Sequence, residues 1–273
     1  MAPVSLRRAS VVALPLLLLG CESLVDFDGL TGGTPKTGAC PTGAVFCSGF
    51  EEGSKNVWSD ADGNPDSTNP ILVDPGPFDR TGNHVMKLTS NADLLKLLPQ
   101  SYDKLYVRWY VRWEGGIALR GGLYGGGRDV VGIDNSRPKG DDWFAVLVRG
   151  RVSGDAIELG AQYPGMTQNC PNPASDCTAD IFAPDPKPVV ESNRWYCLAM
   201  ELDAGTPTPS ASGASGAADY WVDGVEAGPF GGLWLRSSES LGIDTFWLAS
   251  SSSNGPGILL DDIAVSESPI GCP

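Results

Sequence analysis

Histidine is nearly absent from this chain of 273 residues, which contains only His84. Zinc sites commonly take nitrogen ligands from histidine, and no cysteine pair of the CxxC type is present to replace them. A zinc centre is therefore not expected. His84 falls on the apolar side of an expected strand, so we interpret it as a packed side chain and not as a catalytic base.

Positive charge is also scarce. The chain has 19 lysine and arginine residues against 33 aspartate and glutamate residues, and its formal net charge is -14 at pH 7. A protein of this charge repels phosphate backbones, so we expect no nucleic-acid partner. A polyanionic glycan would need a local group of arginines to overcome the same repulsion.

Long apolar runs are missing after the first 20 residues. Within them, Arg7 and Arg8 precede the apolar run 11–19, which is too short to span a bilayer. The ending Leu18-Leu19-Gly20-Cys21 resembles the lipobox of bacterial lipoproteins, and this resemblance implies cleavage before Cys21 and lipidation of its thiol. The alternative is an ordinary secretory signal peptide followed by a chance cysteine.

The expected organisation has three parts. Residues 1–20 form a lipoprotein signal peptide, and residues 21–43 form the lipidated N-terminus and a flexible tether rich in glycine, threonine and proline. Residues 44–273 form one domain, which we expect to be a monomer. Glu22 replaces the aspartate typical of inner-membrane retention, so we expect the outer membrane or the cell surface.

Six cysteines remain after position 21, an even number that favours disulfides in an exported chain. They are Cys40, Cys47, Cys170, Cys177, Cys197 and Cys272. Because Cys170 and Cys177 flank a turn-rich segment, we predict that they pair. Elimination then pairs Cys40 with Cys47 and Cys197 with Cys272, and the rival pairing joins Cys47 to Cys272.

Helical periodicity is also lacking, and short alternating strands separated by turn residues fill the chain. The clearest strand is 105–113, which directs four apolar side chains to one side and four polar or aromatic ones to the other. These sets are Val107, Trp109, Val111 and Trp113, and Tyr106, Arg108, Tyr110 and Arg112. We predict an all-β, two-sheet antiparallel jelly-roll sandwich. The glycine-rich residues 115–127 are expected to form a flexible loop, and residues 204–218 a disordered insertion.

Several short motifs carry a family resemblance. They are Phe50-Glu51, Leu105-Tyr106-Val107-Arg108, Trp195-Tyr196-Cys197, Val222-Asp223-Gly224 and the stretch 259–265. Together they resemble concanavalin A-like lectin/glucanase domains, and among these the glucuronan-lyase-like and Cip1-like group. The resemblance covers roughly residues 46–272, and it implies a jelly roll whose first and last strands pair antiparallel.

That pairing would bring Glu51 close to Asp261 and Asp262, and Asn83 can add an amide oxygen. Calcium prefers such oxygen ligands, so we predict a structural Ca²⁺ held by these four residues. The alternative is that the two aspartates only end a strand and that Glu51 is solvated.

The candidate site is the polar face of the strand at 105–113, together with a glutamine and a tyrosine farther along. Its residues are Tyr106, Arg108, Tyr110, Arg112, Gln162 and Tyr163. Tyrosine rings stack on sugar rings and arginine donates paired hydrogen bonds, so we predict a polysaccharide-binding surface.

A polyuronate lyase is the enzymatic alternative, because the arginine strand resembles that of alginate-lyase-like sandwiches, with Tyr110 in the glutamate position. There, β-elimination would use Arg108 or Arg112 to neutralise the uronate carboxylate, Gln162 to assist, and a tyrosine to exchange protons. Hydrolysis is less favoured, since no strand carries the carboxylate pattern of glucanases. A third hypothesis is a structural or interaction lipoprotein whose arginines pair with Glu158, Glu201 or Asp203.

The lipid anchor can be tested directly. Replacing Cys21 with serine removes the thiol that receives the lipid, so the domain should move from the membrane fraction to the soluble fraction. Fractionation with a salt wash and mass spectrometry of the N-terminus measure this. A membrane-bound Cys21→Ser variant, or a wild-type protein with an unmodified N-terminus, would contradict the assignment.

Overall fold

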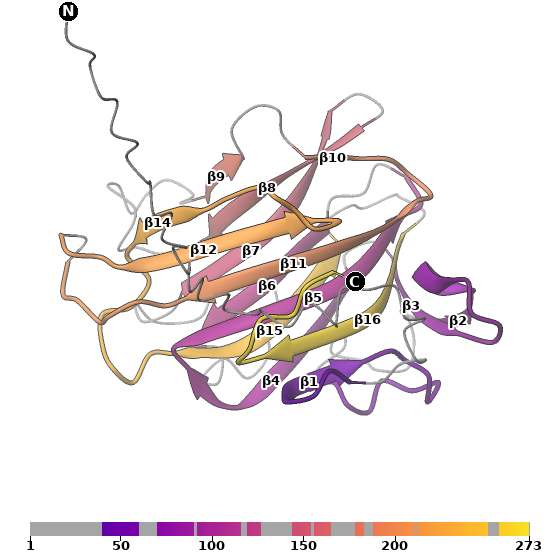
Figure 1. The fold of residues 1–273 in the computed structure, drawn as a ribbon, viewed down its shortest axis with the longest axis horizontal. Helices are drawn as coiled ribbons and strands as arrows, with labels where there is room; N and C mark the ends of the chain where they lie inside the picture. Colours follow the sequence, from indigo (N-terminus) through magenta and orange to yellow (C-terminus); the bar gives the residue numbers. More distant parts are fainter. Residues whose placement is uncertain are drawn as a thin grey trace, which may run out of the picture. The chain divides into compact units, whose positions relative to one another are not determined.

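Two antiparallel β-sheets make up the computed structural model of this chain (Figure 1). It describes residues 40–59, 70–89, 92–115, 119–126, 144–153, 156–164, 178–182, 188–210, 212–250 and 257–272. The nine-stranded sheet A has the order β13 (Val225–Glu226), β12 (Gly216–Val222), β11 (Trp195–Asp203), β5 (Lys104–Trp113), β16 (Ile258–Ser266), β3 (His84–Leu88) and β2 (Ile71–Val73). In addition, β1 (Ala44–Ser48) pairs with β16, and β14 (Phe230–Leu233) pairs with β12.

The seven-stranded sheet B has the order β10 (Val189–Val190), β8 (Ala156–Pro164), β7 (Phe144–Ser153), β6 (Leu119–Gly125), β15 (Ile243–Ser250) and β4 (Asp93–Tyr102). A further strand, β9 (Thr178–Phe182), pairs with β8. In the described residues, the helical structure is the single 3₁₀ turn η2 (Gly76–Phe78). The predicted jelly-roll sandwich is thus confirmed. No helix in the described ranges is long and apolar enough to cross a membrane.

Alternation along β5 supplies the centre of the core. Val107, Trp109, Val111 and Trp113 are all fully buried, as the period of two predicts. Sheet B contributes Phe246 and Leu248 to the same apolar cluster. Truncating a tryptophan at such a site typically costs about 3–5 kcal/mol, so these two indoles are major contributors to the stability of the sandwich.

The ends of the described chain lie side by side in sheet A. β1 runs antiparallel to β16, with Cys47 opposite Ala264 and Ser48 opposite Ile263 (Figure 1). This confirms the expected pairing of the first and last strands. The disulfides Cys40–Cys47 and Cys197–Cys272 are also present, whereas the predicted pair of Cys170 and Cys177 lies outside the described residues.

The glycine-rich segment was expected to be a flexible loop, and this prediction is wrong for residues 119–125. They form β6, an interior strand of sheet B between β7 and β15. Close packing explains its glycines, because a Cβ at Gly121 would lie 2.5 Å from Cδ2 of Leu248 and 3.3 Å from the Trp109 ring. Glycine is needed there for space and not for flexibility.

The predicted disordered insertion at 204–218 is wrong as well. β12 already begins at Gly216, and hydrogen bonds hold the residues before it. The indole nitrogen of Trp234 donates to the carbonyl of Thr208 at 2.9 Å, and the backbone N–H of Thr206 donates to Oγ of Ser215 at 2.9 Å. Serine and threonine here satisfy backbone groups in an ordered loop. After β12, Asp223 and Gly224 both have positive φ, as the two central residues of a tight hairpin turn to β13 require.

Candidate functional site

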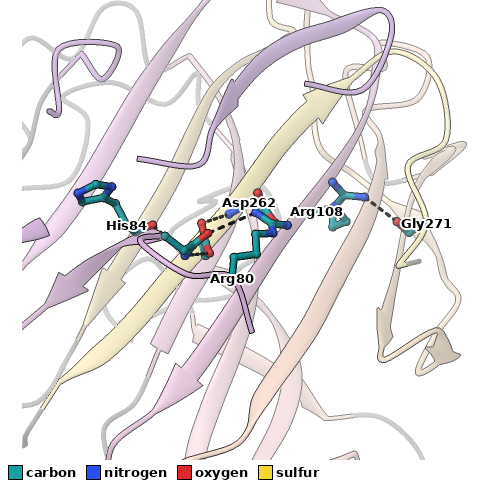
Figure 2. Close-up of polar contacts among 7 residues, drawn as sticks. Arg80, His84, Arg108, Asp262 and Gly271 are labelled. Carbon is teal, nitrogen blue, oxygen red and sulfur yellow. Dashed lines mark hydrogen bonds and ion pairs between the residues drawn. The ribbon is translucent and has the colours of Figure 1, made fainter. Parts of the chain in front are cut away.

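The outer face of β5 carries Tyr106, Arg108, Tyr110 and Arg112, opposite the buried tryptophans. Neighbouring groups already engage both arginines. Arg112 forms an ion pair with Asp74 at 2.8 Å, and its guanidinium lies 5.2 Å from the ring centre of Trp195. Arg108 donates from Nη1 to the backbone carbonyl of Gly271 at 3.2 Å (Figure 2).

Tyr110 is almost completely covered, with 6% of its surface exposed. Its ring meets Phe78 edge to face, with 4.9 Å between the ring centres. Burial is the main reason that the pKa of Tyr110 rises to about 12. A phenol in this setting keeps its proton at neutral pH, which disfavours the proton exchange that the lyase hypothesis assigns to it.

Gln162 and Tyr163 do not lie on the same sheet as the arginine strand. They belong to β8 in sheet B, whereas β5 belongs to sheet A. The six predicted residues therefore do not form one surface, which corrects the site as we expected it. Gln162 is the register partner of Leu147 on β7 and of Asp180 on β9. The reason is the chain path, because the chain leaves sheet A after β5 and forms β6 to β10 in sheet B before it returns at β11.

Within the described residues, neither Glu201 nor Asp203 forms the expected ion pair with an arginine of β5. Glu201 lies next to Tyr106 in the register, but its ion pair is with Lys104, at 2.5 Å. Asp203 accepts a hydrogen bond from the backbone N–H of Gly205 at 2.8 Å. Glu158 is on β8 in the other sheet.

The four predicted calcium ligands do not converge on one point. Asp261 is fully buried, and its carboxylate accepts hydrogen bonds from the Asn83 amide at 2.9 Å and from the Asp262 backbone N–H at 2.8 Å. Asp262 instead pairs with Arg80 at 2.7 Å (Figure 2), and Glu51 lies 3.6 Å from Nδ1 of His84. Thus Asp261 and Asn83 meet, whereas the carboxylates of Glu51 and Asp262 have other partners.

The environment of Asp261 is unusual for an anion. Burial, followed by the nearby charge of Asp262, raises the pKa of Asp261 to about 7. The backbone of Gly76, at a φ of +69°, comes very close: a Cβ there would stand 2.7 Å from Oδ2 of Asp261 and 2.5 Å from Nδ2 of Asn83. Within the described ranges, no group of three or more histidine, cysteine, aspartate or glutamate side chains is arranged to hold a metal ion.

A second apolar cluster lies on the outer face of sheet B, separate from the core. It consists of the buried Ala145 and Leu147 on β7 with the partly exposed Tyr124 on β6 and Trp247 on β15. The two aromatic rings are 5.5 Å apart and almost perpendicular, at 86°. The Trp247 indole donates to Oδ2 of Asp93 at 3.0 Å, which fixes the orientation of the ring.

Sequence reasoning missed this cluster. Tyr124 lies in the segment 115–127 that was expected to be a glycine-rich loop, so the sequence predicted no contact between it and a neighbouring strand. A signal was available on β15, where Phe246 and Leu248 alternate into the core. That alternation places Trp247 on the solvent side, where a large aromatic side chain is uncommon unless it packs or binds.

Comparison with known proteins gives the fold. No protein-family model matches the chain, and no curated protein matches its sequence. Solved structures do resemble it. Alginate lyase vAL-1 from Chlorella virus has a TM-score of 0.59 at 11% identity, covering 78% of this chain and 94% of its own. The PL-14 alginate lyase from Aplysia kurodai has a TM-score of 0.57 at 12% identity, covering 81% and 98% respectively.

The endo-beta-1,4-glucuronan lyase from the fungus Trichoderma reesei is also similar, with a TM-score of 0.50 at 12% identity over 82% of this chain and 96% of its own. At identities this low, the likeness establishes a shared jelly-roll sandwich and leaves the activity to be argued from the residues.

Burial of Tyr110 predicts a loss of stability in alkali. Its folded pKa of about 12 lies above the ordinary value of 10, so the unfolded chain releases this proton first and stability falls as the pH rises from 10 towards 12. Tyr110→Phe removes that contribution and should flatten the alkaline decline of Tm. Tyr106→Phe, a partly exposed phenol on the same strand face, is the matched control. Equal slopes for wild type and Tyr110→Phe would contradict the assignment.

Proposed function

We propose that this domain is a polysaccharide-binding sandwich whose sugar-binding surface is the outer face of sheet B. The observation that carries the proposal is the partly exposed pair of Trp247 and Tyr124. Aromatic faces offer apolar platforms for sugar rings, and exposed apolar clusters on a protein commonly mark binding surfaces.

The geometry of the pair suits a fixed platform. Tyr124 and Trp247 pack edge to face, so the position of the indole is held by its neighbour on β6. Asp93 fixes the indole through its N–H, and Leu147 and Ala145 support the two rings from β7. A preorganised ring loses little conformational entropy when a ligand stacks on it, so this arrangement favours binding.

The known structures with this fold support the same class of ligand. The similar proteins described above are named as lyases of alginate and glucuronan, which are polysaccharides. Binding without turnover is the better proposal for this chain, because two of the β5 groups that β-elimination would use are not available for it. Arg112 is paired with Asp74, and Tyr110 is buried.

The sugar-binding surface is tested with a glycan array followed by affinity measurements on the best ligand. Trp247→Ala removes the platform and should weaken binding by about tenfold or more, the equivalent of roughly 1.4 kcal/mol. Trp221→Ala is the matched control, because Trp221 is a partly exposed tryptophan on β12 in the opposite sheet. Its removal should leave the affinity unchanged.

Each outcome has a distinct meaning. If no polysaccharide binds the wild-type domain, the proposed function is wrong. If a sugar binds but Trp247→Ala retains full affinity, the surface is wrong. Incubation with glucuronan and alginate, followed through the absorbance of the unsaturated product, separates binding from the lyase alternative. An absorbance that rises only when the protein is present would replace the binding proposal with a catalytic one.

We also propose that Ca²⁺ binds at Asp261 and Asn83. A fully buried carboxylate is expensive without a cation, and here its donors are one amide and one backbone N–H. Gly76 brings the backbone of its loop close to both side chains, and backbone carbonyl oxygens are common calcium ligands in proteins. The bound ion would supply the positive charge that the Asp261 carboxylate lacks and would tie the loop at Gly76 to β16.

Calcium binding predicts a rise in stability. At a free concentration one hundred times the Kd, the ion should raise the free energy of unfolding by about 2.7 kcal/mol, measured as a higher Tm in calcium than in chelator. Asp261→Asn should abolish the difference. Asp262→Asn is the control, because it removes the carboxylate that pairs with Arg80 and should keep the response. A wild-type Tm that is equal in calcium and in chelator would contradict this site.

The location that we propose for this protein rests on the sequence of its N-terminal segment. We propose that lipid on Cys21 holds the sandwich at the bacterial cell envelope, at the outer membrane or cell surface, where it would retain polysaccharide close to the membrane. The support is the sequence pattern at residues 1–21, and the Cys21→Ser fractionation above is its test.

A further inference from the structure

One edge of sheet A is closed by a segment whose strand pairing is interrupted. Residues 225–229, which we call the return segment, run back along β12 from β13 towards β14. The N–H of Ala227 donates to the carbonyl of Tyr220 at 2.8 Å, and strand pairing resumes at Phe230. The two residues between Ala227 and Phe230 have only Asp219 of β12 opposite them. The interruption therefore falls at this carboxyl group.

The side chain of Asp219 is held closely at this point. Its Oδ1 accepts a hydrogen bond from the backbone N–H of Tyr220 at 2.8 Å. Gly228 of the return segment lies against the same carboxyl group, because a Cβ on this glycine would overlap Oδ1 and stand 3.0 Å from Cγ. From β13, the side chain of Glu226 forms a hydrogen bond with that of Asp219. Two carboxyl groups thus meet across the edge of the sheet.

Contact between these two groups requires a proton. An ionised carboxylate only accepts hydrogen bonds, so a hydrogen bond between two carboxyl groups forms only when one of them is protonated. The environment of Asp219 favours the protonated form. Burial, followed by the charge of Glu226, raises the pKa of Asp219 from its ordinary value of 3.8 to about 6, although the N–H of Tyr220 acts in the opposite direction.

The charged groups around the pair do not neutralise it. Glu201 is directly opposite Asp219 on β11, and its ion pair is with Lys104 at 2.5 Å. Asp223 in the hairpin turn is paired with Arg194 at 2.9 Å, and β14 carries no charged residue. In the described part of the chain, neither member of the pair forms an ion pair with a lysine or arginine. Loss of the shared proton therefore leaves two adjacent negative charges.

We propose that Asp219 and Glu226 form a proton-dependent clamp that holds the return segment against β12. With the proton, the two carboxyl groups bridge β12 and β13. Without it, they repel each other and the return segment separates more readily. The closed segment covers backbone N–H and C=O groups of β12 that would be unpaired at an open edge. The clamp belongs to sheet A, so it does not depend on the proposed sugar-binding surface of sheet B.

The direction of the pH effect follows from the two pKa values of Asp219. When the return segment opens, water reaches the carboxyl group and its pKa falls back towards 3.8. Between about pH 4 and pH 6, the closed form keeps a proton that the open form has lost. The stabilisation of the closed form is therefore complete near pH 4, and it is lost as the pH rises through about 6.

The test measures hydrogen exchange of the Ala227 amide by NMR at about pH 4.5 and pH 7.5, corrected for the intrinsic pH dependence of exchange. Its protection factor is compared with that of Ser250, whose N–H donates to the carbonyl of Ala92 at 2.9 Å in sheet B. The protection of Ala227 relative to Ser250 should fall by about tenfold at the higher pH, the change that one pKa unit produces.

Three variants assign the response to this pair. Asp219→Asn supplies an amide that donates to Glu226 as the shared proton does, so the relative protection should be equal at both pH values. Glu226→Gln should remove the response as well. Glu201→Gln is the matched control and should keep it, because Glu201 is paired with Lys104.

Three results would overturn the clamp. The first is a relative protection of Ala227 in the wild-type protein that is the same at both pH values. The second is a wild-type response that persists in Asp219→Asn and in Glu226→Gln. The third is a response that disappears in Glu201→Gln.

Discussion

Burial of the inner side of β5 is the constraint on which the rest of the sandwich depends. Trp109 and Trp113 fill the space between the sheets, and a Cβ at position 121 of β6 would lie 2.5 Å from Cδ2 of Leu248 and 3.3 Å from the Trp109 ring. The same alternation sends Arg108 and Arg112 to the outer side of sheet A. Both arginines then need acceptors from other segments, because a half-buried guanidinium without partners is costly. The loop at Asp74 and the C-terminal segment provide them.

The local hydropathy pattern of the sequence predicts strands that have one apolar and one polar face. It fails at positions where the residue type is determined by contacts with residues far away in the sequence. The strand at 105–113, which forms β5, was predicted because its apolar residues alternate with polar ones. β6 was not, because glycines carry no hydropathy signal and their purpose is the room they leave for Leu248 and Trp109.

The candidate site shows the same division. The alternation of side chains along β5 was predicted correctly, but placing Gln162 relative to that strand required knowledge of which sheet holds β8. The acceptors of the two arginines are 38 residues away for Arg112 and 163 residues away for Arg108. Sequence motifs with a fixed spacing cannot predict contacts between residues that are so far apart in the chain. The pairing of the first and last strands was predicted through the resemblance. The meeting of Asn83 and Asp261 comes instead from the pairing of β3 with β16.

The Cys40–Cys47 disulfide has a mechanical consequence for the lipid anchor and the polymer binding that we propose. Under that proposal, a polymer bound to the sandwich would pull against the N-terminal anchor, and the tension would arrive at Cys40. The disulfide passes that load directly to Cys47, which lies opposite Ala264 in the pairing of β1 with β16. Because the disulfide carries the force past the first residues of β1, their hydrogen bonds to β16 are not broken one after another. Load is instead shared among the bonds around Cys47 and Ser48, so a short edge strand can serve as an attachment point under force.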